Sequence, residues 1–218
     1  MTVVEEFMMK MRLCLVLFLA AVGISCENVG MPVNPEVAIQ ILPLRVGNQW
    51  KYTSIVYDSA GVEKQRWAEQ QSVIADTVVD GEVWYLTDFS SYLTNRLDGV
   101  WQMMPNWTFT GISLGLQDPQ LLLPFPTPIG SSITVRSIET YTLLKKDVEV
   151  TVPAGTFSCY QYRMTLPESL TAVTEYDLFY APDVGLVKRT WSIRDDPRPY
   201  SIISYYSGEL LLTEINLH

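Results

Sequence analysis

The fold class is decided by residues 147–160, which read Asp147-Val148-Glu149-Val150-Thr151-Val152-Pro153-Ala154-Gly155-Thr156-Phe157-Ser158-Cys159-Tyr160. The valines at 148, 150 and 152 alternate with polar residues, which is the period of a strand with one buried and one exposed face. Pro153-Ala154-Gly155 follows directly, and proline presets the backbone angle φ for the first central residue of a turn. The stretch therefore predicts a β-hairpin whose second strand covers residues 156–165.

The rest of the domain repeats this organisation of short strands and turns. Asp80-Gly81 and Asp98-Gly99 each lie between segments rich in β-branched and aromatic residues, and such pairs are typical of two-residue hairpin turns that need positive φ at both positions. Further strands are predicted at 176–180, 186–193 and 200–212. No window has the period of an amphipathic helix. We therefore expect a mainly β domain with little helix, built as a single curved antiparallel sheet or an open half-barrel.

The first residues have the organisation of a bacterial signal peptide. Lys10 and Arg12 precede the apolar run Leu13–Ile24, which is long enough for a signal-peptide core and shorter than the roughly 20 residues of a membrane-spanning helix. Small residues then precede Cys26, an arrangement that resembles the lipobox of bacterial lipoproteins. The resemblance implies a diacylglyceryl group on the Cys26 thiol and cleavage before it. An ordinary secretory signal with an incidental cysteine is the alternative, because Gly23 stands where the lipobox prefers an aliphatic residue.

These signals divide the chain into a signal peptide (1–25), the lipidated Cys26 with a flexible tether (26–44), and a β-rich domain (45–218). The signal peptide carries two acidic and two basic residues, so its removal leaves the net charge of −9 unchanged. Such an acidic protein is expected to bind neither nucleic acid nor anionic lipid by its charge. The N-terminal lipid is then expected to hold it to a membrane. Glu27 is not the aspartate associated with inner-membrane retention, which favours the outer membrane over the inner, facing the periplasm.

Two motifs in the second half resemble a known family. They are VPAGTF-x-C at 152–159 and YAP-x-VGLVK at 180–188, and NQWKY at 48–52 and FPTPIG at 125–130 are similar to further landmarks. Over about residues 45–212 the chain resembles the DUF3108-like (TapB-type) lipoproteins of unknown function. The resemblance implies a curved antiparallel sheet akin to the lipoprotein-carrier folds, and it leaves the activity to be argued from the site.

The residue types argue against an enzyme. His218 is the one histidine and the last residue, where chains usually fray, whereas Ser-His-Asp and Cys-His systems need a positioned imidazole. Cys159 is expected to be a small buried hydrophobe rather than a reactive thiol. We expect no metal and no cofactor. Paired carboxylates remain the catalytic option, and the candidates are Glu139, Asp147, Glu149, Glu168, Glu175 and Asp177.

Residues 103–130 form a long apolar segment with one formal charge, Asp118. Packing into the core is the commoner use of such residues, so the segment is expected to fill the concave side of the sheet. Long loops are also often lids or binding loops, so the alternative is that the segment lines a site for an apolar ligand. The candidate ligand-lining residues are Trp107, Phe109, Leu114, Leu116, Leu122 and Phe125.

Together these observations predict a non-enzymatic cell-envelope lipoprotein. Its expected partners are the membrane, through the lipid, and an apolar small molecule or an envelope protein on the concave face of the sheet. A structural or assembly role without a small-molecule ligand is the first alternative, and a carboxylate-based hydrolase is the second.

The lipobox assignment makes a direct prediction. Cys26→Ala should abolish acylation and leave either an unprocessed precursor or an exported form without lipid, because the thiol is the acceptor of the lipid. Membrane fractionation and mass spectrometry of the N-terminus measure both outcomes. Covalent lipid on the Cys26→Ala protein would show that the assignment is wrong.

Overall fold

The computed structural model describes residues 39–108, 111–135, 138–167, 173–193 and 207–218. Cys26 and its signal peptide therefore lie outside the described residues. The described residues form strands and no helix, so no helix among them could cross a membrane. The strands are β1 (Gln49–Tyr57), β2 (Glu63–Val79), β3 (Glu82–Thr87), β4 (Tyr92–Arg96), β5 (Gly99–Met103), β6 (Pro105–Thr108), β7 (Gly111–Leu116), β8 (Gln120–Pro124), β9 (Ser132–Val135), β10 (Glu139–Val152), β11 (Gly155–Thr165), β12 (Val173–Ala181), β13 (Gly185–Ile193) and β14 (Ser207–Asn216).

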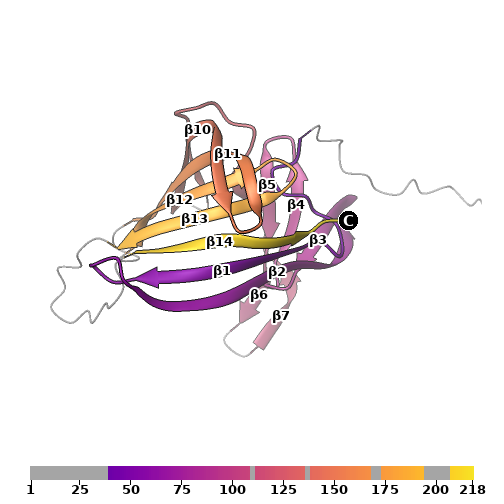
Figure 1. Cartoon of the computed structure of the whole chain (residues 1–218). Coiled ribbons are helices and arrows are strands. Elements are labelled where there is room, and N and C mark those ends of the chain that lie inside the picture. The colour runs from indigo at the N-terminus through magenta and orange to yellow at the C-terminus, as the bar shows by residue number, and fades with distance from the viewer. Residues whose placement is uncertain (1–38, 109–110, 136–137, 168–172, 194–206) are drawn as a thin grey trace, which may run out of the picture. The chain divides into compact units, whose positions relative to one another are not determined.

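Twelve of these strands form one antiparallel sheet in the order β8-β5-β4-β3-β2-β1-β14-β13-β12-β11-β10-β9 (Figure 1). The sheet curves until its two edge strands, β8 and β9, approach each other without pairing. The result is a barrel that is nearly closed, with one seam. This confirms the expected mainly β fold with a single curved antiparallel sheet, and closure goes further than an open half-barrel.

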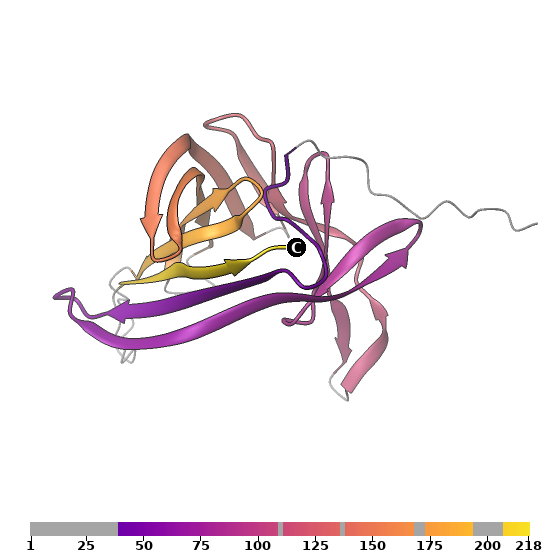
Figure 2. The same cartoon turned by 45° about the vertical axis from the view of Figure 1, so that its right-hand side comes forward.

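Strand β2 joins two halves of the sheet, one that runs from β3 to β8 and one that runs from β1 to β9 (Figure 2). Its residues from Glu63 to Ser72 pair with β1, and those from Val73 onward pair with β3. Between the two pairings, Val73 exchanges backbone hydrogen bonds with the segment before β1: its N–H donates to Asn48 O, and the N–H of Gly47 donates to Val73 O, each at 2.9 Å. The long strand thus carries the chain from one half of the sheet to the other without a break.

The predicted hairpins form, but the turn at Asp98-Gly99 differs from the prediction: Leu97 and Asp98 join β4 to β5, and of Asp98 and Gly99 only Gly99 has positive φ, at 143°. Asp80 and Gly81 join β2 to β3 with φ of 50° and 81°, as a primed turn requires. In β10, Val150 and Val152 are buried while Glu149 is exposed, which confirms the alternation that predicted this strand.

Residues 103–130 contain β6 and β7, which form a separate two-stranded sheet, and the edge strand β8. One sequence-based expectation was wrong. The segment 39–44 is not tether, because Ile41 is 1% exposed within the core and Asn48 Nδ2 donates to Pro43 O at 2.8 Å. Apolar side chains at 41 and 44 bury more surface against the sheet than a solvated tether would. The predicted tether before residue 39 lies outside the described residues.

Two side chains of β1 reach past the neighbouring strand β14 to the chain around the start of β13. Trp50 Nε1 donates to Val184 O at 2.6 Å, and the Tyr52 hydroxyl donates to Leu186 O at 3.1 Å. Val184 directly precedes β13 and Leu186 is its second residue, and β13 lies on the far side of β14 from β1. Gly185 permits this approach, because a Cβ atom there would lie 2.9 Å from Leu42 Cδ1 and 3.4 Å from Trp50 Nε1.

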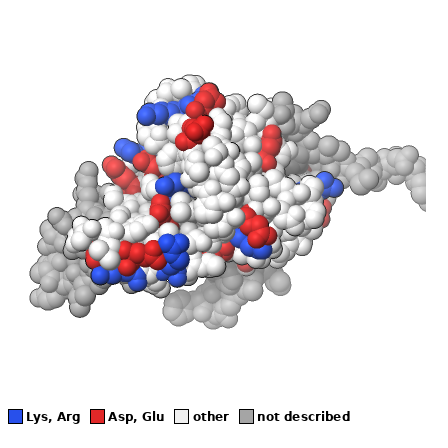
Figure 3. All heavy atoms as spheres, in the orientation of Figure 1, with Lys and Arg blue, Asp and Glu red and all other residues white. Residues whose placement is uncertain are grey.

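Charged side chains occupy the outer face, where cations and anions are interspersed (Figure 3). Lys188 Nζ lies 3.0 Å from Glu209 Oε2, and Arg163 Nε lies 3.0 Å from Asp177 Oδ1. Pairs of this kind, partly exposed to solvent, contribute at most about 1 kcal/mol each. The stability of the domain therefore rests on its interior.

Cys159 lies in that interior, fully buried on β11, and burial raises the pKa of its thiol to about 11. A neutral thiol is a poor nucleophile, so a thiol reagent at pH 7 should modify Cys159 slowly in the native protein and quickly in denaturant. Peptide mass spectrometry over time measures the reaction at this residue apart from other cysteines. Equal rates in native and denatured protein would contradict the burial.

Candidate functional site

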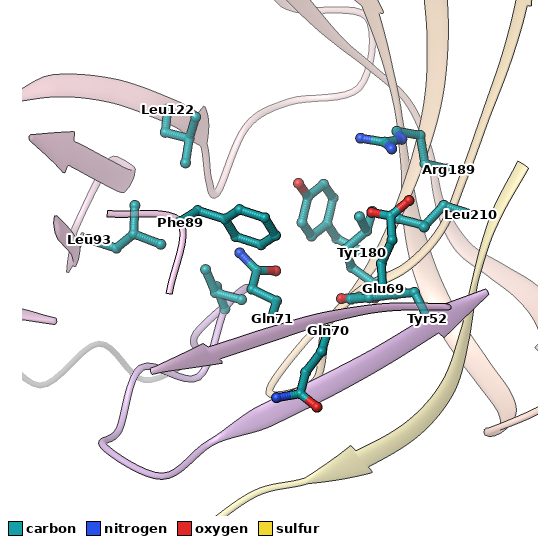
Figure 4. Close-up of a pocket in the computed structure, with 12 residues that line it drawn as sticks. Tyr52, Glu69, Gln70, Gln71, Phe89, Leu93, Leu122, Tyr180, Arg189 and Leu210 are labelled. Carbon is teal, nitrogen blue, oxygen red and sulfur yellow. The ribbon is translucent and has the colours of Figure 1, made fainter. Parts of the chain in front are cut away.

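A cavity of about 340 Å³, partly open to solvent, lies on the concave side of the sheet next to Tyr52 (Figure 4). Its apolar lining consists of Leu42, Phe89, Leu93, Leu122, Leu186 and Leu210. Its polar lining consists of Tyr52, Glu69, Gln70, Gln71, Tyr180 and Arg189. Apolar walls with a few polar groups are typical of small-molecule sites, whose volumes run from about 300 to 1,000 Å³.

Several of the lining residues lie on one face of neighbouring strands. On β1 and β2, Tyr52 is directly opposite Glu69, and on β13 and β14, Arg189 is opposite Leu210. Directly opposed residues in a sheet share one face. Sequence-distant strands therefore bring a tyrosine, an acid, a base and a leucine to the same concave surface.

Arg189 is the residue with the least satisfied surroundings. Its Nε atom is shielded from solvent and has no hydrogen-bond partner among the described residues. Arg189 also forms no ion pair with any described residue. A buried donor left without a partner lowers the stability of the folded state by about 1–3 kcal/mol. Arginine is therefore a destabilising choice at this position if the side chain only fills space.

Trp191 supports the Arg189 side chain. The guanidinium carbon lies 5.4 Å from the centroid of the Trp191 ring, within the range of a cation–π contact. The ring itself lies over Gly208, where any Cβ atom would collide with it. Glycine on β14 thus makes room for the tryptophan that holds the arginine.

The tyrosines of the cavity are neutral at physiological pH. Burial raises the pKa of Tyr180 to about 12, although the nearby Arg189 charge lowers it. Burial also raises the pKa of Tyr52 strongly, and Tyr180 adds to this effect while Arg189 opposes it. The Tyr52 hydroxyl is engaged with Leu186 O, whereas no hydrogen bond of the Tyr180 hydroxyl is found among the described residues.

The predicted lining residues divide into three groups. Leu122 lines the cavity. Phe125 does not: it is 5% exposed in the core, with its ring edge-on to Tyr160 at 5.2 Å, because β8 ends there and turns inward. Trp107 lies on β6, and Leu114 and Leu116 lie on β7, while Phe109 is outside the described residues.

The candidate catalytic groups lie elsewhere. Asp177 is paired with Arg163, and Asp147 and Glu149 are exposed on β10. Glu139 and Glu175 are absent from the cavity lining, and Glu168 lies outside the described residues. Cys159 is in the core, and the exposed His218 donates its backbone N–H to Asn48 Oδ1 at 2.8 Å.

Sequence reasoning missed most of the lining, including Arg189. One signal was present: Val187, Arg189 and Trp191 are two residues apart, which places all three on one face of a strand. A basic residue between two large apolar ones on the buried face marks a charge that faces inward. Leu42, Phe89 and Leu93 carry no comparable signal.

No family model matches the chain, and no curated protein matches its sequence. Among solved structures, the chain is similar to a "putative lipoprotein" from Parabacteroides distasonis, with 15% identity and a TM-score of 0.41 over 82% of this chain and 99% of that chain. The resemblance to the DUF3108-like lipoproteins stays a prediction.

The different positions of Leu122 and Phe125 predict different stability effects. Phe125→Ala should lower the free energy of unfolding by about 3–5 kcal/mol, because it removes a buried ring from the core. Leu122→Ala should cost less than about 2 kcal/mol, since its partly exposed side chain already borders open space. Denaturant titrations of both variants measure the difference. Equal losses would show that the cavity beside Leu122 is filled in solution.

Proposed function

We propose that this protein is a lipid-anchored protein of the cell envelope whose domain binds an apolar small molecule in the cavity on the concave side of its sheet. The observation that carries the proposal is the cavity itself. Its volume of about 340 Å³ lies in the range of ligand sites, and leucines from well-separated parts of the chain line it. A protein that used this interior only for packing would gain stability by filling it.

A binding role suits the lining better than a catalytic one. Among the residues that the structure places around the cavity, Glu69 is the only carboxylate, whereas a glycosidase-type hydrolase needs two facing each other. The tyrosine hydroxyls are protonated at neutral pH and suit hydrogen bonding rather than proton abstraction. We therefore propose a non-enzymatic role for the domain.

The location of the protein is part of the same proposal. Cys26 and the apolar run before it support a lipid anchor, and Glu27 favours the outer membrane over the inner. A domain tethered at a membrane surface would meet apolar molecules where they are abundant. The resemblance to the DUF3108-like lipoproteins agrees with this location.

A second candidate function is the docking of an envelope protein. Ile74 and Val78 on β2 are 54% and 52% exposed. Residues four apart in a strand face the same side, so the two side chains form an apolar spot on that strand. This observation favours the structural or assembly alternative, which needs no small-molecule ligand.

Binding of a neutral apolar probe tests the leading proposal. The full chain carrying Cys26→Ala, free of its own lipid, should bind N-phenyl-1-naphthylamine saturably in a fluorescence titration. Leu122→Trp should weaken binding by at least about tenfold by filling the cavity. The matched control is Leu211→Trp, which adds the same bulk next to Leu210 but outside the cavity lining, and it should bind like the parent chain.

Two results would contradict the proposal. One is fluorescence that rises without saturation in the parent chain. The other is unchanged binding in Leu122→Trp, which would place the probe elsewhere on the protein. If Ile74→Lys binds the probe normally but no longer docks to an envelope protein that the parent chain binds, the docking alternative is favoured.

A further inference from the structure

The cavity is lined by a cation, Arg189, that no described residue neutralises through an ion pair. On β13, Lys188 faces outward and contacts Glu209 at 3.0 Å, whereas its neighbour Arg189 faces inward and has no ion pair among the described residues. The Nε atom of Arg189 is shielded from solvent without an acceptor among the described residues, which is unfavourable and strengthens its interaction with any anion that enters. The wall of the cavity is therefore prepared for a negatively charged group.

A hydrogen-bond donor stands beside this cation. Figure 4 shows Tyr180 and Arg189 extending into the cavity from β12 and β13. The Tyr180 hydroxyl is neutral and, within the described part of the chain, not hydrogen-bonded. A planar guanidinium and a hydroxyl together can supply several donors, which matches the two oxygens of a carboxylate.

Glu69 is the one lining residue that opposes an anion. It is partly exposed on β2, opposite Tyr52, and forms no ion pair with Arg189 among the described contacts. Arg189 is also partly exposed, but its Nε atom is shielded from solvent and lacks an acceptor among the described residues. The anion is thus expected to contact Arg189, and Glu69 is expected to weaken that binding moderately.

The remaining walls fit an alkyl chain. Leu93, Leu122, Leu186 and Leu210 line the cavity, and Phe89, 61% exposed, lies at its border. An apolar cavity of about 150 Å³ takes a benzene molecule, so about 340 Å³ has room for a chain of about ten carbons.

We infer that the cavity binds an alkyl carboxylate of about ten carbons or more, with the carboxylate on Arg189 and Tyr180 and the chain against the leucines. This inference rests on the proposed function and specifies its ligand class. The charge of the head group, rather than apolar area alone, then selects the ligand.

Ligands of equal chain length with different head groups test the inference. Decanoate, decanol and decyltrimethylammonium are used to displace N-phenyl-1-naphthylamine from the full Cys26→Ala chain at pH 7.5. Decanoate should bind at least about tenfold more tightly than decanol, and the ammonium compound should bind more weakly than decanol.

Variants assign this preference to its residues. Arg189→Gln should remove the preference for decanoate while decanol binding stays within about threefold of the parent chain. Lys51→Gln is the matched control, because it removes one positive charge from the outer face of β1, where Lys51 pairs with Glu214, and it should keep the preference. Tyr180→Phe should weaken decanoate binding selectively, and Glu69→Gln should strengthen it.

Each failure has a distinct meaning. If the neutral probe binds saturably but decanoate binds no better than decanol, the carboxylate inference is wrong and the proposed function stands. The carboxylate inference is also wrong if Lys51→Gln and Arg189→Gln behave alike. If no probe binds to a folded parent chain, both proposals fail. Should Arg189→Gln not fold, Tyr180→Phe and Glu69→Gln decide, because unchanged decanoate binding in both would overturn the inference.

Discussion

The structure depends on two hydrogen bonds that cross the interior from β1 to the start of β13. Trp50 Nε1 reaches Val184 O, and the Tyr52 hydroxyl reaches Leu186 O. Buried donors need partners, so both side chains fix how far β13 lies from β1 across the intervening β14. The sheet can satisfy them only when it is strongly curved, and this curvature brings the edge strands β8 and β9 near each other.

The same curvature determines where the interior is full and where it is open. Around Trp50 the packing is close enough to require glycine at position 185. Next to Tyr52 the side chains leave a cavity, whose lining combines leucines and Phe89 with polar residues that include Glu69, Tyr180 and Arg189. Close packing around Trp50 and the cavity next to Tyr52 therefore occur in one arrangement of strands, and Leu42 borders both.

Local features of the fold could be predicted from the sequence, and long-range ones could not. The alternation in residues 148–152 and the Asp80-Gly81 turn determine strands and hairpins within a few residues of each other. The pairing of β1 with β14 joins residues such as Val56 and Gly208, and no local pattern specifies it. Leu122 and Leu123 illustrate the limit for the site: a bulge between β5 and β8 leaves Leu122 at the cavity while Leu123 is 2% exposed.

Arg189 connects the stability of the fold with its proposed function. Val187 and Trp191, on either side of it and on the same face, are apolar, and an apolar residue at 189 would suit a purely structural interior better. A guanidinium whose Nε is shielded and has no acceptor among the described residues instead lowers the stability of the protein without ligand. A ligand that supplies the missing acceptor removes this free-energy cost, and it does so only in the folded state, because only there is the donor shielded. Ligand binding and folding are then coupled through one side chain, and the occupied domain is the more stable form.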